Sequence, residues 1–112
     1  MLYSSCKMID KNIILNKFSS TFWIEKEKMQ SYFKQKGYND FESVYGELEE
    51  MRVRVFDFLL MKTEPNLQLS EHEIVELSVT FLKENYPWID KKGIKSVNNH
   101  ILWMCWHEGL SK

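Results

Sequence analysis

Apolar residues recur every three or four positions along most of the chain, which is the spacing of one face of an α-helix. The longest such pattern begins at Phe41 and continues through Val44, Tyr45, Leu48, Met51, Val55, Phe56 and Leu59. Within it, the run MRVRVFDF alternates between apolar and polar residues, as a β-strand does. The steady phase from residue 44 to residue 59 favours a long helix, and a strand over residues 51–58 is the alternative.

The rest of the pattern predicts four further helices, over residues 8–18, from 20 or 21 to 36, 70–85 and 90–108. Gly37 follows the second of these as a residue suited to the left-handed helix stop, and Gly109 follows the last. Pro87 ends the helix before it, because the residue that precedes a proline is disfavoured in helical conformation.

Three of the predicted helices begin with residues that can cap free backbone N–H groups. Ser70 and Glu73 have the spacing of a capping box, in which each side chain accepts from the backbone of the other residue. Asn39 and Glu42 have the same spacing before the long helix, and Asp90 is a candidate cap for the last helix. Local signals therefore mark helix starts through most of the chain.

Length and composition agree with a helical domain. A chain of 112 residues has the size of one domain. Its four glycines and two prolines are few for an all-β fold with many tight turns. We expect an all-α fold, a compact single-domain bundle of about five helices that spans residues 1–112.

The two cysteines, Cys6 and Cys105, lie far apart in the sequence. The first ten residues, MLYSSCKMID, contain no apolar run of signal-peptide length, and no segment has the length needed to span a bilayer. We therefore expect a cytoplasmic protein with no membrane association and with both thiols free, and a disulfide is the minority alternative.

The segment HILWMCWHEG, residues 100–109, contains the residue types of a metal or catalytic centre. On one helix, however, His100 and His107 stand two turns apart, roughly 10 Å, which is too far to share one ion. Cys105 shares the apolar side of this helix with Ile94 and Ile101, where a buried and inert thiol belongs. We expect no metal, no cofactor and no catalytic residue, and hence a protein that is not an enzyme.

The other side of the same helix carries Trp103 between His100 and His107, with Trp106 on its flank. Both tryptophans could pack under neighbouring helices, as large aromatic residues usually do. Alternatively, Trp103 and the two histidines form an exposed patch that anchors a protein partner. Arg52 lies within an apolar arc, so its stem is expected on the core with its head in water, or else in a buried pair with a carboxylate, perhaps of the fourth helix.

Charge divides the chain unevenly, although the net charge is only −1. Residues 37–90 contain twelve acidic residues against four basic ones, whereas both flanking segments are basic. Acidic residues are favoured near helix N-termini, which explains part of this excess. The remainder is a candidate surface for a basic protein and argues against nucleic acid as the partner.

In overall character the chain resembles a bacterial toxin-immunity protein of the contact-dependent growth-inhibition type. The features that carry the resemblance are its small helical domain, the acidic runs ELEE and SEHE, and the segment ILWMCWHEG. The resemblance implies a non-enzymatic inhibitor that occludes the active site of a basic, nuclease-like toxin domain, with carboxylates standing in for phosphates. The predicted partner-binding residues are Asp40, Glu42, Glu47, Glu49, Glu50, Glu71, Glu73, Glu76, His100, Trp103 and His107.

A small helix-turn-helix-like DNA-binding regulator is the alternative function. In this reading, GIKSVNNHILW is the recognition element, with Asn98, Asn99 and His100 on base edges and lysines on phosphates. Those lysines are Lys91, Lys92 and Lys95. The connection NYPWID is longer than the usual turn of this motif, and the net charge also counts against it.

Overall fold

The computed structural model describes residues 9–63 and 68–109, and it confirms a compact, mainly helical domain. Five helices and one short hairpin occur in these residues. Their order is α1 (Lys11–Phe18), β1 (Ser19–Ser20), β2 (Trp23–Ile24), α2 (Lys26–Lys36), α3 (Phe41–Lys62), α4 (Glu71–Asn85) and α5 (Lys91–His107). The long apolar pattern is helical throughout, so the strand alternative for residues 51–58 is wrong.

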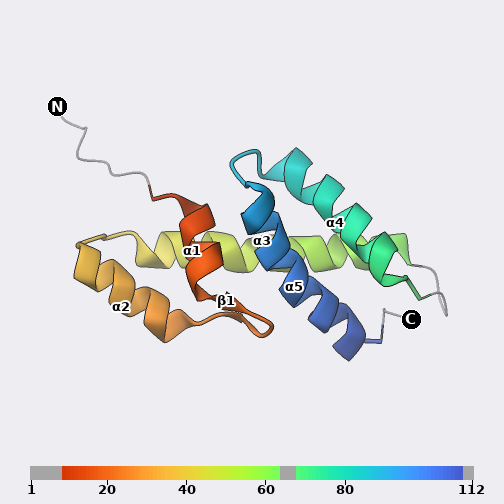
Figure 1. Cartoon of the computed structure of the whole chain (residues 1–112), viewed down its shortest axis with the longest axis horizontal. Helices are drawn as coiled ribbons and strands as arrows, with labels where there is room; N and C mark the ends of the chain where they lie inside the picture. Colours follow the sequence, from red (N-terminus) through yellow and green to blue (C-terminus); the bar gives the residue numbers. More distant parts are fainter. Residues whose placement is uncertain (1–8, 64–67, 110–112) are drawn as a thin grey trace.

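Helix α3 supports the other elements. It has 22 residues, a length of roughly 33 Å, and α1, α5 and α4 cross over the same side of it (Figure 1). Helix α5 contacts α1, α3, α4 and β1, so it lies at the centre of the packing. The buried stripe of α3 includes Leu48, Met51, Val55 and Leu59, none of which is accessible to solvent. One side of α3 therefore builds the core, and the opposite side faces solvent.

Most of the predicted boundaries are confirmed. Ser70 and Glu73 form the capping box, Asp90 accepts from the backbone of Gly93, and Gly37 ends α2 in the left-handed conformation. The box predicted for Asn39 and Glu42 is wrong, because the residue at the N-cap of α3 is Asp40, without a side-chain cap. Helix α3 thus begins one residue later than expected.

The hairpin between α1 and α2 corrects the predicted start of the second helix. Residues 19–24 form two antiparallel pairs, Ser19 with Ile24 and Ser20 with Trp23, and α2 begins only at Lys26. The Ser20 hydroxyl stabilises the turn, since it accepts from the Phe22 amide and donates to the Trp23 carbonyl. Burial of Trp23 and Ile24 in the core favours the hairpin over the helix that local propensity suggested.

Asn12 joins α1 to the turn between α4 and α5. Its amide group donates to the Trp88 carbonyl over 2.9 Å, and its side-chain oxygen accepts from the Asp90 amide over 2.9 Å. Gly93 faces the same side chain so closely that an added Cβ would collide with it. A buried amide thus replaces water for two backbone groups and fixes the start of α5 against α1.

We expect the substitution Asn12→Ala to lower the free energy of unfolding by about 2–3 kcal/mol, because a backbone carbonyl and a backbone amide lose their partner. Urea denaturation measures this change. Asn16→Ala is the matched control, since this asparagine lies on the same helix but is exposed, where it accepts from Ser96. Equal losses in the two variants would contradict this role of Asn12.

Candidate functional site

The segment HILWMCWHEG belongs to the second half of α5 and to the residues that follow it. Ile101 and Cys105 point into the core and are inaccessible to solvent. Burial raises the pKa of the Cys105 thiol to about 11, so it is protonated and unreactive at neutral pH. The expected inert thiol is confirmed for Cys105, whereas Cys6 lies outside the described residues.

His100 does not belong to the surface, contrary to the predicted partner-binding set. Only 2% of it is exposed, because the hairpin covers this position of α5. Its Nδ1 donates to the Thr21 carbonyl over 2.8 Å, and its ring lies 5.0 Å from the Trp23 ring between centroids. The expected surface position was wrong because the segment that covers His100 was expected to be helical.

The surroundings of His100 favour its neutral form. Burial lowers its pKa, and the positive charge of Arg52 lowers it further, while the hydrogen bond to Thr21 and the charge of Glu49 act in the opposite direction. Its Nε2 has no hydrogen-bond partner in the described part of the chain. A proton at Nε2 would therefore place a charge in a site that offers it no acceptor.

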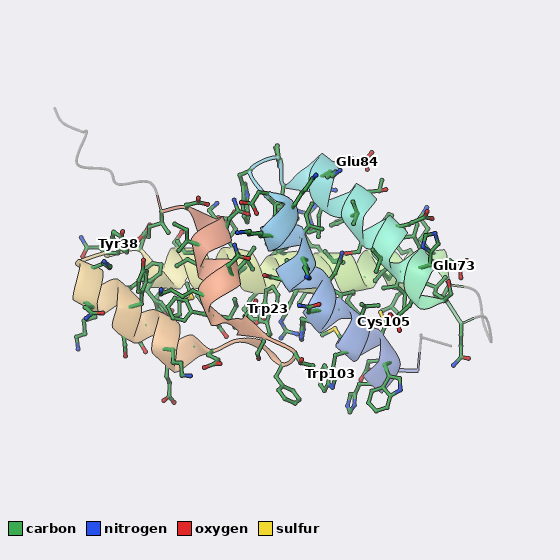
Figure 2. The ribbon with its side chains drawn as sticks, viewed as in Figure 1. Trp23, Tyr38, Glu73, Glu84, Trp103 and Cys105 are labelled. Carbon is green, nitrogen blue, oxygen red and sulfur yellow. The ribbon has the colours of Figure 1, made fainter. Side chains whose placement is uncertain are left out.

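Trp103 and His107 do come together at the surface, and the hairpin adds a third ring. The rings of Trp103 and His107 stack with centroids 5.0 Å apart, and Phe22 meets Trp103 edge-on at 5.1 Å. Trp106 is 67% exposed, so it does not pack under a neighbouring helix. Trp103 lies in the last turns of α5, beside the hairpin (Figure 2). We call these four residues the aromatic patch.

The carboxylates of the run ELEE differ in their contacts. Glu47 forms an ion pair with Lys11 at 2.6 Å. Glu49 pairs with Arg52 of its own helix at 2.6 Å and accepts from the Tyr45 hydroxyl, so the alternative of a partner on α4 is wrong for Arg52. Glu50 is exposed and makes no ion pair with a described residue. Two of these three carboxylates are thus already neutralised within the protein.

The remaining predicted acidic residues lie at two ends of the molecule. Asp40 and Glu42 are at the start of α3, whereas Glu71, Glu73 and Glu76 are at the start of α4, beside the other end of α3 (Figure 1). Glu73 serves in the capping box, and Glu76 pairs with His72 at 3.1 Å. The eight predicted carboxylates therefore do not form one surface, because the length of α3 separates them.

A smaller surface does bring carboxylates and apolar groups together, and we call it the α3 outer face. Successive residues of an α-helix are rotated by about 100° around its axis. On this basis, one arc of α3 lies opposite the buried stripe, and it carries no lysine or arginine. Val53 and Leu60 on this arc are 48% and 43% exposed, although both are apolar. The arc consists of Glu42, Gly46, Glu49, Glu50, Val53, Asp57 and Leu60, all accessible to solvent.

The sequence prediction did not include Val53, Asp57 and Leu60. The helical periodicity that predicted the core could also have placed these residues on the surface. Val53 and Leu60 stand seven residues apart, on the same side of the helix, and this side is not the one that carries the buried stripe. An exposed apolar patch rimmed by polar residues is one mark of a surface that binds proteins.

The geometry removes much of the basis for DNA recognition by α5. Asn98 is buried and accepts from the Ser78 hydroxyl, and His100 is buried under the hairpin. Of the three residues expected on base edges, Asn99 alone is exposed. The helix therefore cannot present the expected recognition set in a groove.

No model of a known protein family matches this chain, and neither a curated protein nor a solved structure is detectably similar to it.

Within residues 9–63 and 68–109, no three His, Cys, Asp or Glu side chains are grouped so that they could hold a metal ion. No helix in the same part of the chain combines the length and the apolar character required to cross a bilayer.

We expect the free energy of unfolding to fall as the pH is lowered below about 6.5, and His100 to cause part of this fall. Because the folded protein lowers the pKa of His100, the unfolded chain takes up a proton at a higher pH than the folded chain does. Denaturant titrations between pH 7.5 and pH 5 measure the effect. These two limits lie at least about 1 pH unit above and below the ordinary pKa of histidine.

The variant His100→Gln should show a shallower loss of stability with falling pH than the original protein. His72→Gln is the control, because that imidazole is exposed and its ion-pair partner among the described residues is Glu76. If His100→Gln leaves the pH dependence unchanged, His100 does not titrate with unfolding.

Proposed function

We propose that this protein is a non-enzymatic, protein-binding inhibitor of the immunity type, which captures a basic toxin domain on the α3 outer face. The observation that carries the proposal is the set of free carboxylates on this face. Glu42, Glu50 and Asp57 are exposed and make no ion pair with a described residue. Their charge is therefore available to a partner.

The arrangement of this face suits a basic protein surface in two ways. Opposite charges accelerate the encounter of two proteins and disfavour wrong partners. Val53 and Leu60, between and beside the carboxylates, supply apolar area whose burial gives affinity once the surfaces meet. A nuclease groove that binds phosphates would accept carboxylates in their place, so occupancy of the groove would block its substrate.

The test is co-expression with the product of the neighbouring reading frame, which we expect to be a toxin with a basic catalytic domain. This protein should restore growth and form a complex with that domain. The charge-reversal variant E42K/E50K/D57K should weaken the complex on the order of 100-fold, a loss of about 2.7 kcal/mol. Isothermal titration calorimetry measures the affinity, and circular dichroism checks that the variant folds.

The variant E71K/E76K/E84K on α4 is the matched control, because it changes the net charge by the same amount on one other helix. It should protect cells as the original protein does. Loss of binding in this variant alone would move the site to α4, and failure of the original protein to bind or protect would refute the proposed function.

A further inference from the structure

The tip of the hairpin, residues 20–23, lies against α5 through three consecutive residues (Figure 1). The Thr21 carbonyl accepts from His100 Nδ1 over 2.8 Å, and the Trp23 ring lies 5.0 Å from the same imidazole between centroids. Phe22 meets Trp103 edge-on at 5.1 Å. The tip therefore covers His100, of which only 2% is exposed.

Few bonds hold this tip in place. The hairpin has only two residue pairs, and both hydrogen bonds of the Ser20 hydroxyl stay within the tip. Among the described residues, the bond from His100 to Thr21 is the only side-chain hydrogen bond between the tip and α5. Trp23 has a φ of +94°, which is unfavourable for a residue with a side chain, and its burial keeps the tip closed. Such a segment opens at a lower free energy than the whole molecule unfolds.

The contact between the His100 and Trp23 rings contains two buried nitrogen atoms without a partner in the described part of the chain. They are His100 Nε2 and Trp23 Nε1. The indole N–H can only donate, and the neutral imidazole, which uses its Nδ1 proton for Thr21, has an acceptor at Nε2. A proton at Nε2 turns it into a second donor, so neither nitrogen can then accept from the other. It also buries a charge away from water.

The charged groups that act on His100 belong to α3. Arg52 lowers the pKa of the imidazole and Glu49 raises it, and these two residues pair at 2.6 Å, so their effects oppose each other. The hairpin tip contains no charged residue, and on α5 itself His107 stacks on Trp103. No charged residue in the described parts of α1 and α4 shifts the pKa of His100. Burial under the tip is therefore the largest effect, and it lowers this pKa.

From these contacts we propose that residues 20–23 form an acid-released flap, which opens away from α5 when His100 takes up a proton. In the open form, His100 Nε2 and Trp23 Nε1 both reach water, and Trp23 can leave its left-handed backbone conformation. Opening also separates Phe22 from Trp103 and so divides the aromatic patch. The surface at this end of α5 thus differs between neutral and mildly acidic solution. The proposal does not rest on the proposed function, which concerns carboxylates of α3.

The direction of the pH dependence follows from the difference between the two forms. The closed form lowers the pKa of His100, whereas the exposed imidazole of the open form has its ordinary pKa of about 6.5. The open form therefore binds the proton more tightly, and its population rises as the pH falls below about 6.5. At neutral pH, the hydrogen bond to Thr21 and the burial of Trp23 keep the flap closed.

Hydrogen exchange followed by NMR between pH 7.5 and pH 5 measures the opening. After correction for the intrinsic pH dependence of exchange, the Trp23 indole N–H should exchange on the order of 10-fold faster at pH 5. Backbone amides in the core of α3, such as that of Val55, should keep their corrected rates. In the same samples, the ring signals of His100 should titrate with the midpoint of the Trp23 exchange, and this comparison requires no variant.

The variant His100→Gln removes the titrating group, while its side-chain amide can still donate to the Thr21 carbonyl. Its Trp23 exchange should be the same at both pH values. His107→Gln is the matched control, because this imidazole lies on the same helix but is exposed, and its flap should open as in the original protein.

Four results would each overturn the proposal. They are a tip that stays protected at pH 5, a tip that opens only together with the core of α3, different midpoints for His100 and Trp23, and acid opening that persists in His100→Gln. Acid opening that disappears in His107→Gln would assign the titration to the wrong histidine and would overturn it as well. If His100→Gln does not fold, the two midpoints measured in the original protein decide.

Discussion

The burial of α5 on all sides but one is the constraint on which the rest of the structure depends. Neighbours on several sides force polar residues of α5 inward, and each needs a partner. Asn98 accepts from Ser78 of α4, and His100 donates to the Thr21 carbonyl of the hairpin. Asn12 of α1 satisfies the backbone where α5 begins. These contacts fix three neighbours against one helix, and one arc of α5, which includes Lys95, Asn99 and Trp106, is exposed to solvent.

The hairpin connects the buried part of α5 with the surface of the molecule. Trp23 adopts a φ of +94°, a conformation that residues with a side chain rarely occupy, and it keeps its indole in the core beside His100. The turn that results places Phe22 outside, 74% exposed and against Trp103. One strained residue thus connects a buried histidine with the aromatic patch.

Charge has two separate roles in this molecule. Glu47 and Glu49 are neutralised by Lys11 and Arg52, so these carboxylates contribute to the fold rather than to a partner. Glu50 and Asp57, on the same helix, make no such pair with a described residue. The amino-acid composition does not distinguish these four carboxylates. The structure shows which of them are paired with a cation.

The sequence by itself determined the helices, most of their ends and the inert thiol at Cys105, because periodicity and caps involve residues only three or four positions apart. Tertiary structure alone decided the hairpin, the burial of His100 and the pairing of Glu47. The hydrogen bond from His100 joins residues 79 positions apart, and the pair of Lys11 and Glu47 joins residues 36 apart. No local pattern records such contacts, since they exist only when the chain has folded.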